Sequence, residues 1–261
     1  MTSSPGNSTV PRGETAETAP MLDMRGIGKH FGGVVALEDV AISVKSEEVV
    51  AIVGDNGAGK STLMKIVAGV HTPDAGEMWI QGNREEFRNP LHARAEGVEV
   101  VYQDLALATE QSVFMNMFLG RELIHGPFRL LDKRRMRRET EEILNDLDVH
   151  VPSVGAPVYH LSGGQRQGLA IGRATHWAQR IVLLDEPTAA LGVQETGKVE
   201  ESIKRMRARG LAVLMVSHDL DQVFRLADRI YVLRRGRLAG EQVASESTGD
   251  EVVSLITGSR S

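Results

Sequence analysis

The most informative stretch of the sequence is Gly54-Asp55-Asn56-Gly57-Ala58-Gly59-Lys60-Ser61. It matches the pattern G-x-x-x-x-G-K-[ST], in which glycines let the backbone curl so that successive N–H groups point at phosphate oxygens. A helix that begins near Lys60 would add the positive end of its dipole. We therefore predict that this loop and the adjacent Thr62 bind a nucleotide. Lys60 is expected to bridge the β- and γ-phosphates, and the Ser61 hydroxyl to ligate Mg²⁺.

The residues on either side of this loop fit a strand before it and a helix after it. Residues 49–53 form a short apolar run rich in β-branched side chains, and residues 61–68 carry apolar side chains at helical spacing before Gly69. This is the context in which the pattern binds phosphate. It disfavours the alternative of a glycine-rich turn that binds nothing.

Other parts of the chain repeat the alternation of strand and helix. Residues 181–184 and 211–216 are short, nearly unbroken apolar runs, which indicate strands buried on both faces, as in a parallel sheet. Between them, residues 196–209 carry apolar side chains at helical spacing and are followed by Gly210. Strands that alternate with helices predict a doubly wound α/β core.

The middle of the chain differs, because strand signals fade between residues 104 and 160. Residues 132–147 predict a helix that begins at Asp132, a good capping residue. Its apolar face holds Met136, Ile143, Leu144 and Leu147. We predict that a helical subdomain, over about residues 104–165, is inserted into the α/β core.

The two ends of the chain are polar. Residues 1–20 are rich in Ser, Thr and Pro without an apolar stretch, which indicates a disordered tail and no signal peptide. We expect the folded domain to cover residues 21–245. Residues 246–261 are expected to form a C-terminal extension with a short helix. The longest apolar runs are far shorter than the roughly 18 residues of a membrane-spanning helix, so a role at a membrane requires a partner.

Two carboxylates, Asp185 and Glu186, follow the apolar run 181–184. Open α/β sheets bind ligands at the carboxyl ends of their strands. We expect Asp185 to hold Mg²⁺ through a water molecule, and Glu186 to orient the attacking water or accept its proton. The alternative is a pair of acids that cap the next helix.

The most specific signal is Leu161-Ser162-Gly163-Gly164-Gln165. Ser162 can cap a helix that begins near the glycines, which creates a second anion-binding helix end. One domain does not need two such ends for one ATP, but a second is useful if it binds the γ-phosphate of a neighbour's ATP. The alternative is a glycine-rich loop in a helical connector.

Composition limits the possible partners. With 30 basic and 35 acidic side chains, the net charge is −5, which argues against nucleic acid or anionic lipid as the main surface partner. The absence of cysteine excludes disulfides, thiolate metal sites and a cysteine nucleophile.

A basic run at residues 133–138 is the one candidate for nucleic-acid binding. Arg135, Arg137 and Arg138 each stand four residues before an acid, however. This spacing is typical of a solvated, salt-bridged helix face. We therefore predict no nucleic-acid partner.

Together these segments resemble the ABC ATPase family over residues 22–240. Members of that family form head-to-tail dimers that hold two ATP molecules, each between a phosphate loop and the partner's Leu-Ser-Gly-Gly-Gln motif. The resemblance implies a P-loop NTPase (RecA-like) core, an inserted helical subdomain and an antiparallel β subdomain.

Three further residues take their roles only from this resemblance. Phe31 resembles the aromatic residue that stacks on adenine. Gln103 resembles the glutamine that touches Mg²⁺ and links the site to the helical subdomain. His218 resembles the switch histidine that contacts the γ-phosphate.

One position departs from the family pattern. Many members carry Ser-Ala-Leu-Asp after the catalytic glutamate, where this chain has Ala189-Ala190-Leu191-Gly192. The replacement of Asp by Gly192 removes a carboxylate contact across the dimer interface. How the two sites of the dimer communicate is therefore left open.

The closer resemblance is to ATP-binding subunits of monosaccharide importers, the ribose/xylose/fructose class. It rests on Phe31-Gly-Gly-Val-Val-Ala-Leu, Val101-Tyr-Gln-Asp-Leu-Ala-Leu, Phe118-Leu-Gly-Arg-Glu and Asp185-Glu-Pro-Thr-Ala-Ala-Leu-Gly. Many such subunits carry two ABC domains, whereas this chain has one phosphate loop, so the resemblance implies a homodimer. It also implies docking on a membrane permease at the cytoplasmic face of the membrane, with sugar delivered by an extracytoplasmic binding protein.

Three other functions compete with sugar import. A soluble ABC protein acting on ribosomes or DNA carries two cassettes or a long coiled coil, and this chain has neither. A non-hydrolysing scaffold is disfavoured by the presence of Lys60, Asp185, Glu186 and His218. Importers of branched-chain amino acids share the early Phe-Gly-Gly, but their signature region usually differs from Leu-Ser-Gly-Gly-Gln-Arg-Gln.

Overall fold

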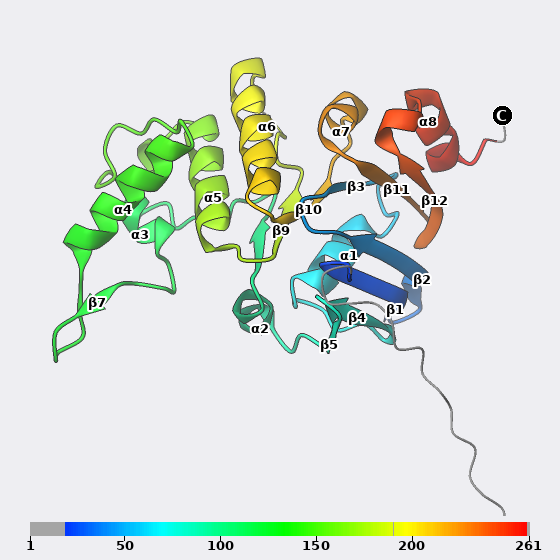
Figure 1. Ribbon diagram of the computed structural model, residues 1–261, viewed down its shortest axis with the longest axis horizontal. Helices are drawn as coiled ribbons and strands as arrows, with labels where there is room; N and C mark the ends of the chain where they lie inside the picture. Colours follow the sequence, from blue (N-terminus) through cyan, green and yellow to red (C-terminus); the bar gives the residue numbers. More distant parts are fainter. Residues whose placement is uncertain (1–18, 190, 260–261) are drawn as a thin grey trace, which may run out of the picture.

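The computed structural model describes residues 19–189 and 191–259. The predicted tail, residues 1–20, therefore lies outside the described residues except for its last two. Figure 1 shows a group of helices at one end, a six-stranded sheet with helices beside it, and a smaller antiparallel sheet below. No helix within the described ranges is both long enough and apolar enough to cross a membrane.

The central sheet has the strand order β12-β11-β3-β10-β9-β6. Its strands are β3 (Val49–Val53), β6 (Val98–Val101), β9 (Ile181–Asp185), β10 (Ala212–Val216), β11 (Arg229–Arg234) and β12 (Arg237–Val243). All of these strands run parallel to their neighbours except β12, which is antiparallel to β11. The predicted parallel core is confirmed, because the three apolar runs of the sequence form β3, β9 and β10.

The side chains of β3 alternate between two hydrophobic clusters, one on each face of the sheet. Val50 and Ile52 pack with α1 (Lys60–Val67) and the antiparallel sheet. Val49 and its alternate neighbours pack with the helices of the other face. These helices are α5 (Gly163–Trp177), α6 (Val193–Ala208), α7 (Leu220–Leu226) and α8 (Gly249–Thr257). A strand covered on both faces must be apolar throughout, which explains the unbroken apolar runs.

The antiparallel sheet has the order β2-β1-β4-β5. Its strands are β1 (Leu22–Phe31), β2 (Val34–Val44), β4 (Ala75–Ile80) and β5 (Asn83–Glu85), and α2 (Pro90–Ala95) leads from β5 to β6. Gly32 and Gly33 form the turn between β1 and β2. The antiparallel β subdomain implied by the family resemblance is therefore present.

The helical part comprises α3 (Val113–Met117), α4 (Lys133–Asp146), the 3₁₀ turn η1 (Val158–His160) and one side of α5. The predicted cap of α4 is confirmed, because the Asp132 carboxylate accepts a hydrogen bond from the Arg135 N–H at 3.0 Å. A short hairpin of β7 (Ile124–His125) and β8 (Leu130–Leu131) precedes α4. The sequence pattern does not predict this hairpin, because two-residue strands are too short to show alternation.

The basic run of α4 is partly neutralised within the helix, as predicted. Arg135 pairs with Glu139 at 2.6 Å, and Arg138 lies 3.8 Å from Glu142. Arg137 instead lies over the ring of Phe114, 4.8 Å from its centroid. At the end of the chain, α8 confirms the predicted C-terminal helix.

Candidate active site

The predicted site residues follow four neighbouring strands of the central sheet. The loop 54–59 follows β3, His218 follows β10, Asp185 ends β9 and Gln103 follows β6. These strands are parallel and adjacent in that order. Residues from four distant parts of the chain thus lie along one edge of the sheet, the edge at which open α/β sheets bind ligands.

The loop between β3 and α1 requires glycine at several positions. Gly54 and Gly59 have φ angles of 150° and 107°, and Gly57 has a φ angle of 79°. A Cβ atom at Gly54 would lie 2.1 Å from the Leu233 carbonyl oxygen, and one at Gly59 would lie 2.7 Å from the Ala36 carbonyl oxygen. The sequence motif is therefore matched by a backbone that other residues cannot adopt at low cost.

The end of α1 beside this loop is open to a ligand. Gly59 is the N-cap and makes no side-chain capping hydrogen bond, so the first N–H groups of α1 have no side-chain acceptor at that position. Lys60 Nζ donates to the carbonyl oxygens of Gly54 at 2.7 Å and Asp55 at 3.0 Å. The loop thus holds a cation beside a helix N-terminus, and both features favour a negatively charged ligand.

The remaining residues of the loop differ in exposure. Asp55, Asn56, Gly57 and Ser61 are exposed, Thr62 is half-buried and Ala58 is buried. The buried Ala58 anchors the loop in a second way, because its carbonyl oxygen accepts a hydrogen bond from the Gly236 N–H at 3.0 Å. The exposed residues therefore belong to a loop whose backbone is held in place by Ala58.

Asp185 is a half-buried carboxylate beside a second carboxylate. Burial raises the pKa of Asp185, and the neighbouring Glu186 raises it further. Lys60 and Lys65 oppose this rise through their positive charges. Asp185 is therefore an acid whose charge the protein only partly compensates.

Glu186 and His218 form a pair across two neighbouring strands. Glu186 has a φ angle of 51°, and its N–H donates to the Val216 carbonyl oxygen at 3.0 Å. Its Oε2 lies 2.7 Å from His218 Nδ1, and the His218 side chain is 75% exposed. The alternative in which the two acids cap the next helix is excluded, because Gly192 is the N-cap of α6.

Two buried glutamines that the sequence did not single out connect these loops. Gln222 Oε1 accepts hydrogen bonds from Thr188 and Ser217, both at 3.1 Å, and so ties the segment after β9 to the segment after β10. Gln167 of α5 donates to the Pro187 carbonyl oxygen at 2.6 Å. Gln222 lies in no motif, and Gln167 ends the stretch Leu-Ser-Gly-Gly-Gln-Arg-Gln without a role assigned to it, although a buried glutamine on a helix is an unusual residue that needs hydrogen-bond partners.

The side chains of Phe31 and Gln103 are both accessible, as their predicted roles require. Phe31, at the end of β1, is 44% exposed, with its ring 5.2 Å from that of His71 and 5.6 Å from Lys29 Nζ. Gln103 is exposed two residues after β6. Stacking of Phe31 on adenine and contact of Gln103 with Mg²⁺ stay predictions.

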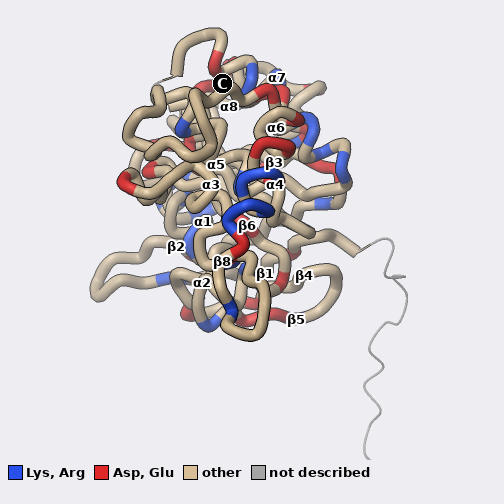
Figure 2. Tube along the Cα trace, turned by 90° about the vertical axis from the view of Figure 1, so that its left-hand side faces the viewer, with Lys and Arg blue, Asp and Glu red and all other residues tan. Residues whose placement is uncertain are grey.

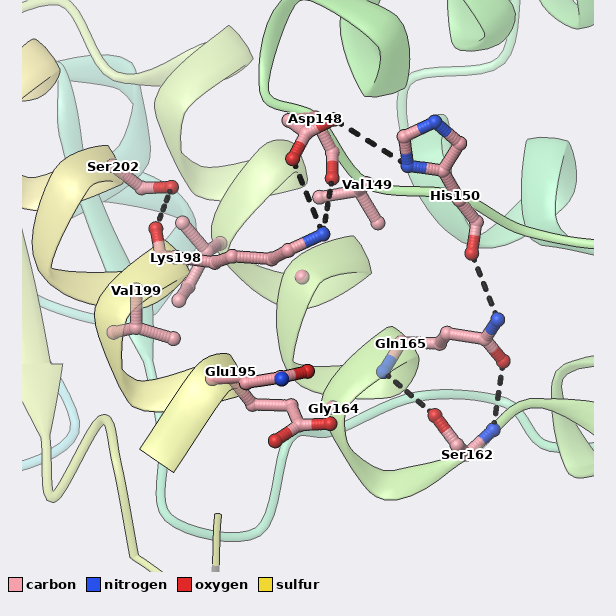
Figure 3. A pocket seen from close by; sticks show the side chains of 13 residues that line it. Asp148, Val149, His150, Ser162, Gly164, Gln165, Glu195, Lys198, Val199 and Ser202 are labelled. Carbon is pink, nitrogen blue, oxygen red and sulfur yellow. Dashed lines mark hydrogen bonds and ion pairs between the residues drawn. The ribbon is translucent and has the colours of Figure 1, made fainter. Parts of the chain in front are cut away.

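The predicted signature loop begins α5. Ser162 and Gln165 form a reciprocal capping box, as the sequence predicts for Ser162, and Gln165 Nε2 also donates to the His150 carbonyl oxygen at 2.8 Å (Figure 3). Gly163 faces open space, whereas a Cβ atom on Gly164 would lie 2.5 Å from Glu195 Cγ. The loop borders a pocket of about 260 Å³ between α5 and α6.

The two candidate anion sites of the chain are not brought together. No hydrogen bond or ion pair among residues 19–189 and 191–259 joins the loop 54–62 to residues 162–165. One belongs to the edge of the sheet and the other to the N-terminus of α5. Of the segment that departs from the family pattern, Ala190 lies outside the described residues, and a Cβ atom on Gly192 would lie 2.7 Å from Glu195 Oε2.

Comparison with known proteins agrees with this geometry. A family model described as "ABC transporter" matches residues 37–189. The xylose/arabinose import ATP-binding protein of Sulfolobus acidocaldarius is 41% identical, over 91% of this chain and 94% of that protein. The fructose import ATP-binding protein of Rhizobium meliloti is also 41% identical, over 92% and 95%. A ribose import ATP-binding protein of Rubrobacter xylanophilus is 44% identical over 92% of this chain, which spans 46% of that longer protein.

Solved structures extend the likeness to the fold. A nucleotide-free ATP-binding cassette from an ABC transporter is 26% identical, with a TM-score of 0.76 over 92% of this chain and 96% of that one. A dimeric cassette in a post-hydrolysis state, bound to ADP and Pi, is 25% identical, with a TM-score of 0.73 over 86% and 99%. The family model, the relatives and the solved structures agree with the phosphate loop, the acidic strand end and the capped Ser162 loop: this chain belongs to the ABC transporter family of ATP-binding cassettes.

Proposed function

We propose that this chain is the ATPase subunit of a monosaccharide importer, and that it works as a homodimer against membrane permease subunits. The observation that carries the proposal is the Glu186–His218 pair, 2.7 Å apart on the sheet edge that also holds the phosphate loop. A base, a histidine and a cation-bearing loop at one edge are the parts that hydrolysis of a nucleoside triphosphate requires.

The reaction assigned to these residues is hydrolysis of ATP by one step of water attack. A water molecule attacks the γ-phosphorus while the bond to the leaving ADP oxygen breaks. Glu186 orients this water and accepts its proton, and His218 contacts the γ-phosphate. Lys60 and the N–H groups of residues 54–61 stabilise the charge on the phosphate oxygens, because both are fixed before the reaction begins.

Three oxygen donors at the carboxyl ends of β6 and β9 and at the start of α1 suit Mg²⁺. The Ser61 hydroxyl, the Asp185 carboxylate and the Gln103 amide oxygen are hard oxygen ligands of the kind that Mg²⁺ prefers. A cation would also offset the burial and the Glu186 charge that raise the pKa of Asp185. Bound with ATP, Mg²⁺ neutralises negative charge on the β- and γ-phosphates.

A second copy of the chain completes each site. The N-terminus of α5 carries an exposed Ser162 and an open Gly163, and it contacts no part of its own phosphate loop among the described residues. We assign Ser162, Gly163, Gly164 and Gln165 to the γ-phosphate of the partner's ATP. ATP then holds the dimer shut, and its hydrolysis removes the contact that favours the closed state. The dimeric form of a related cassette supports this arrangement.

The cargo is inferred from the relatives. Proteins named for import of xylose/arabinose, fructose, ribose and galactose match at 36–44% identity over most of this chain. A monosaccharide is the class that they share. The subunit then lies at the cytoplasmic face of the membrane, held there by the permease, and an extracytoplasmic protein delivers the sugar.

Transport by a reconstituted complex tests the proposal. The chain and its permease, placed in liposomes with binding protein, should accumulate a pentose or hexose only with ATP and Mg²⁺. The same complex should not transport leucine or isoleucine. Uptake of branched-chain amino acids instead of sugars would reject the cargo, and ATP hydrolysis without coupling to any permease would reject the transport role.

A further inference from the structure

The β7–β8 hairpin exposes an apolar surface that no part of the protein covers among the described residues. Phe128 at its tip is 85% exposed, and Ile124, Leu130 and Leu131 are also exposed. Figure 1 shows the hairpin projecting beyond α3 and α4, at the end of the molecule farthest from α8. A two-stranded hairpin is marginally stable by itself in water, so this surface indicates an external partner.

Exposed cations border this apolar surface. Arg129 lies at the tip, and Lys133 and Arg134 lie in the first turn of α4. Within the described part of the chain none of these three forms an ion pair, unlike Arg135 and Arg138. Figure 2, turned toward this end of the molecule, shows the blue of the α4 cations beside β8.

The position of these cations is unfavourable within the protein itself. The first turn of α4 contains no acid, and positive charge near a helix N-terminus opposes the helix dipole. The nearby acids are already engaged: Asp132 caps α4, and Glu122 accepts the Gly120 N–H at 3.0 Å. The cations therefore gain most from an anion that comes from outside the chain.

The local charge also contrasts with that of the whole chain. Residues 121–138 contain seven Lys or Arg and two Asp or Glu, whereas the complete chain has a net charge of −5. Apolar side chains next to uncompensated cations are characteristic of segments that lie on an anionic membrane surface.

We propose that the β7–β8 hairpin and the first turn of α4 bind the surface of an anionic phospholipid bilayer. Phe128 and Leu130 enter the boundary between headgroups and acyl chains, while Arg129, Lys133 and Arg134 contact headgroup phosphates. The predicted acidic balance of the chain, which argues against lipid as a partner, is an average that conceals this local surface. The contact does not depend on ATP, so its failure would leave the proposed ATPase role intact.

Vesicle flotation of the purified full-length chain, without permease, tests this directly. The chain should float with vesicles that mix phosphatidylcholine and phosphatidylglycerol, but not with phosphatidylcholine alone, and added salt should weaken binding. Phe128→Ala should weaken binding about tenfold. Lys133→Gln combined with Arg134→Gln should weaken it about 25-fold, since each surface cation contributes about fivefold.

Matched controls keep the result interpretable. Leu91→Ala removes an apolar side chain that is 72% exposed on α2, and Arg88→Gln with Lys204→Gln removes two exposed cations elsewhere. Both controls should float like the unchanged chain, and ATPase activity in solution should be the same for all variants. Failure to bind anionic vesicles, or equal losses in the control variants, would overturn the proposal. Reduced recovery with the permease, without any vesicle binding, would assign the hairpin to a protein contact instead.

Discussion

Glu186 Oε2 lies 2.7 Å from His218 Nδ1, although the two residues are 32 positions apart in the chain. They meet because β9 and β10 are adjacent parallel strands and each residue follows the end of its strand. Glu186 is largely shielded, with 15% of its side chain exposed, whereas His218 is open to solvent. A proton taken up by Glu186 therefore has an imidazole within hydrogen-bonding distance.

Glu186→Gln should abolish most turnover while keeping the shape of the site. We expect ATP hydrolysis to fall about 10²–10⁴-fold, the usual effect of losing a general base, because glutamine cannot accept the proton from water. The variant should also accumulate as an ATP-bound dimer in size-exclusion chromatography. Phosphate release measures the first effect, and Glu86→Gln, at an exposed acid, is the control. Hydrolysis at the unchanged rate would remove Glu186 from its role, and a monomer at high concentration with ATP would contradict the proposal that ATP holds the dimer shut.

Lys60→Ala should weaken nucleotide binding itself. The ammonium lies over the phosphate loop, 2.7 Å from the Gly54 carbonyl oxygen, and a charge-assisted bond to phosphate contributes about 1.5–3 kcal/mol. ATP affinity should therefore fall about 10- to 100-fold in a titration with a fluorescent ATP analogue. Lys65→Ala removes an exposed charge from the same helix and should change affinity far less. Equal affinity of Lys60→Ala and the unchanged chain would refute the assignment.

Gln222→Leu should reduce both stability and turnover. Its buried side-chain oxygen accepts hydrogen bonds from Thr188 and Ser217, and losing them leaves two hydroxyl groups without their acceptor. We expect a loss of about 1–3 kcal/mol in the free energy of unfolding. Because the bonds position the loops of Glu186 and His218, kcat should fall with little change in KM.

A control variant at a second glutamine separates an effect on the position of the catalytic loops from an effect on stability. Gln242 accepts a hydrogen bond from Ser247 at 2.9 Å, on an edge strand far along the sheet order from β9. Gln242→Leu should lower stability in denaturant titration without changing kcat. If both variants lowered kcat alike, the role of Gln222 would be structural only.

The sequence predicts the parts of the fold whose pattern is local. The strands β3, β9 and β10 are unbroken apolar runs because both of their faces are covered. Strand β6 contains Glu99, whose carboxylate pairs with Arg121 at 2.6 Å. This charged residue interrupts the apolar run, so the sequence pattern does not indicate a buried strand there. The two-residue strands of the β7–β8 hairpin leave no pattern at all.

The candidate site likewise combines features that a local sequence pattern predicts with contacts that depend on the whole fold. The phosphate loop and the Ser162 cap are local features, and the geometry of each matches its motif. The approach of Glu186 to His218 depends on the order of strands in the sheet, which no local pattern encodes. Gln222 was not predicted, because its importance lies in two partners distant from each other in sequence.

Asp185→Asn should stabilise the protein while impairing its activity. Burial, and then the charge of Glu186, raise the pKa of Asp185 above its ordinary value of 3.8, so the ionised form is less favourable in the folded chain than in the unfolded one. Below pH 3.8 the group is protonated in both states and contributes no difference. As pH rises through the raised pKa, the folded state alone bears the cost of ionisation, so the destabilisation is complete at neutral pH. The asparagine variant should therefore have a higher free energy of unfolding than the unchanged chain at pH 7, and should lose that gain below about pH 4. Thermal unfolding at several pH values, without nucleotide or metal, measures this difference.

Mg²⁺-dependent ATPase activity should fall in the same variant, because the amide is a weaker ligand for a hard cation. A variant less stable than the unchanged chain at pH 7 would show that Asp185 is held by favourable contacts and not by the need for a bound cation.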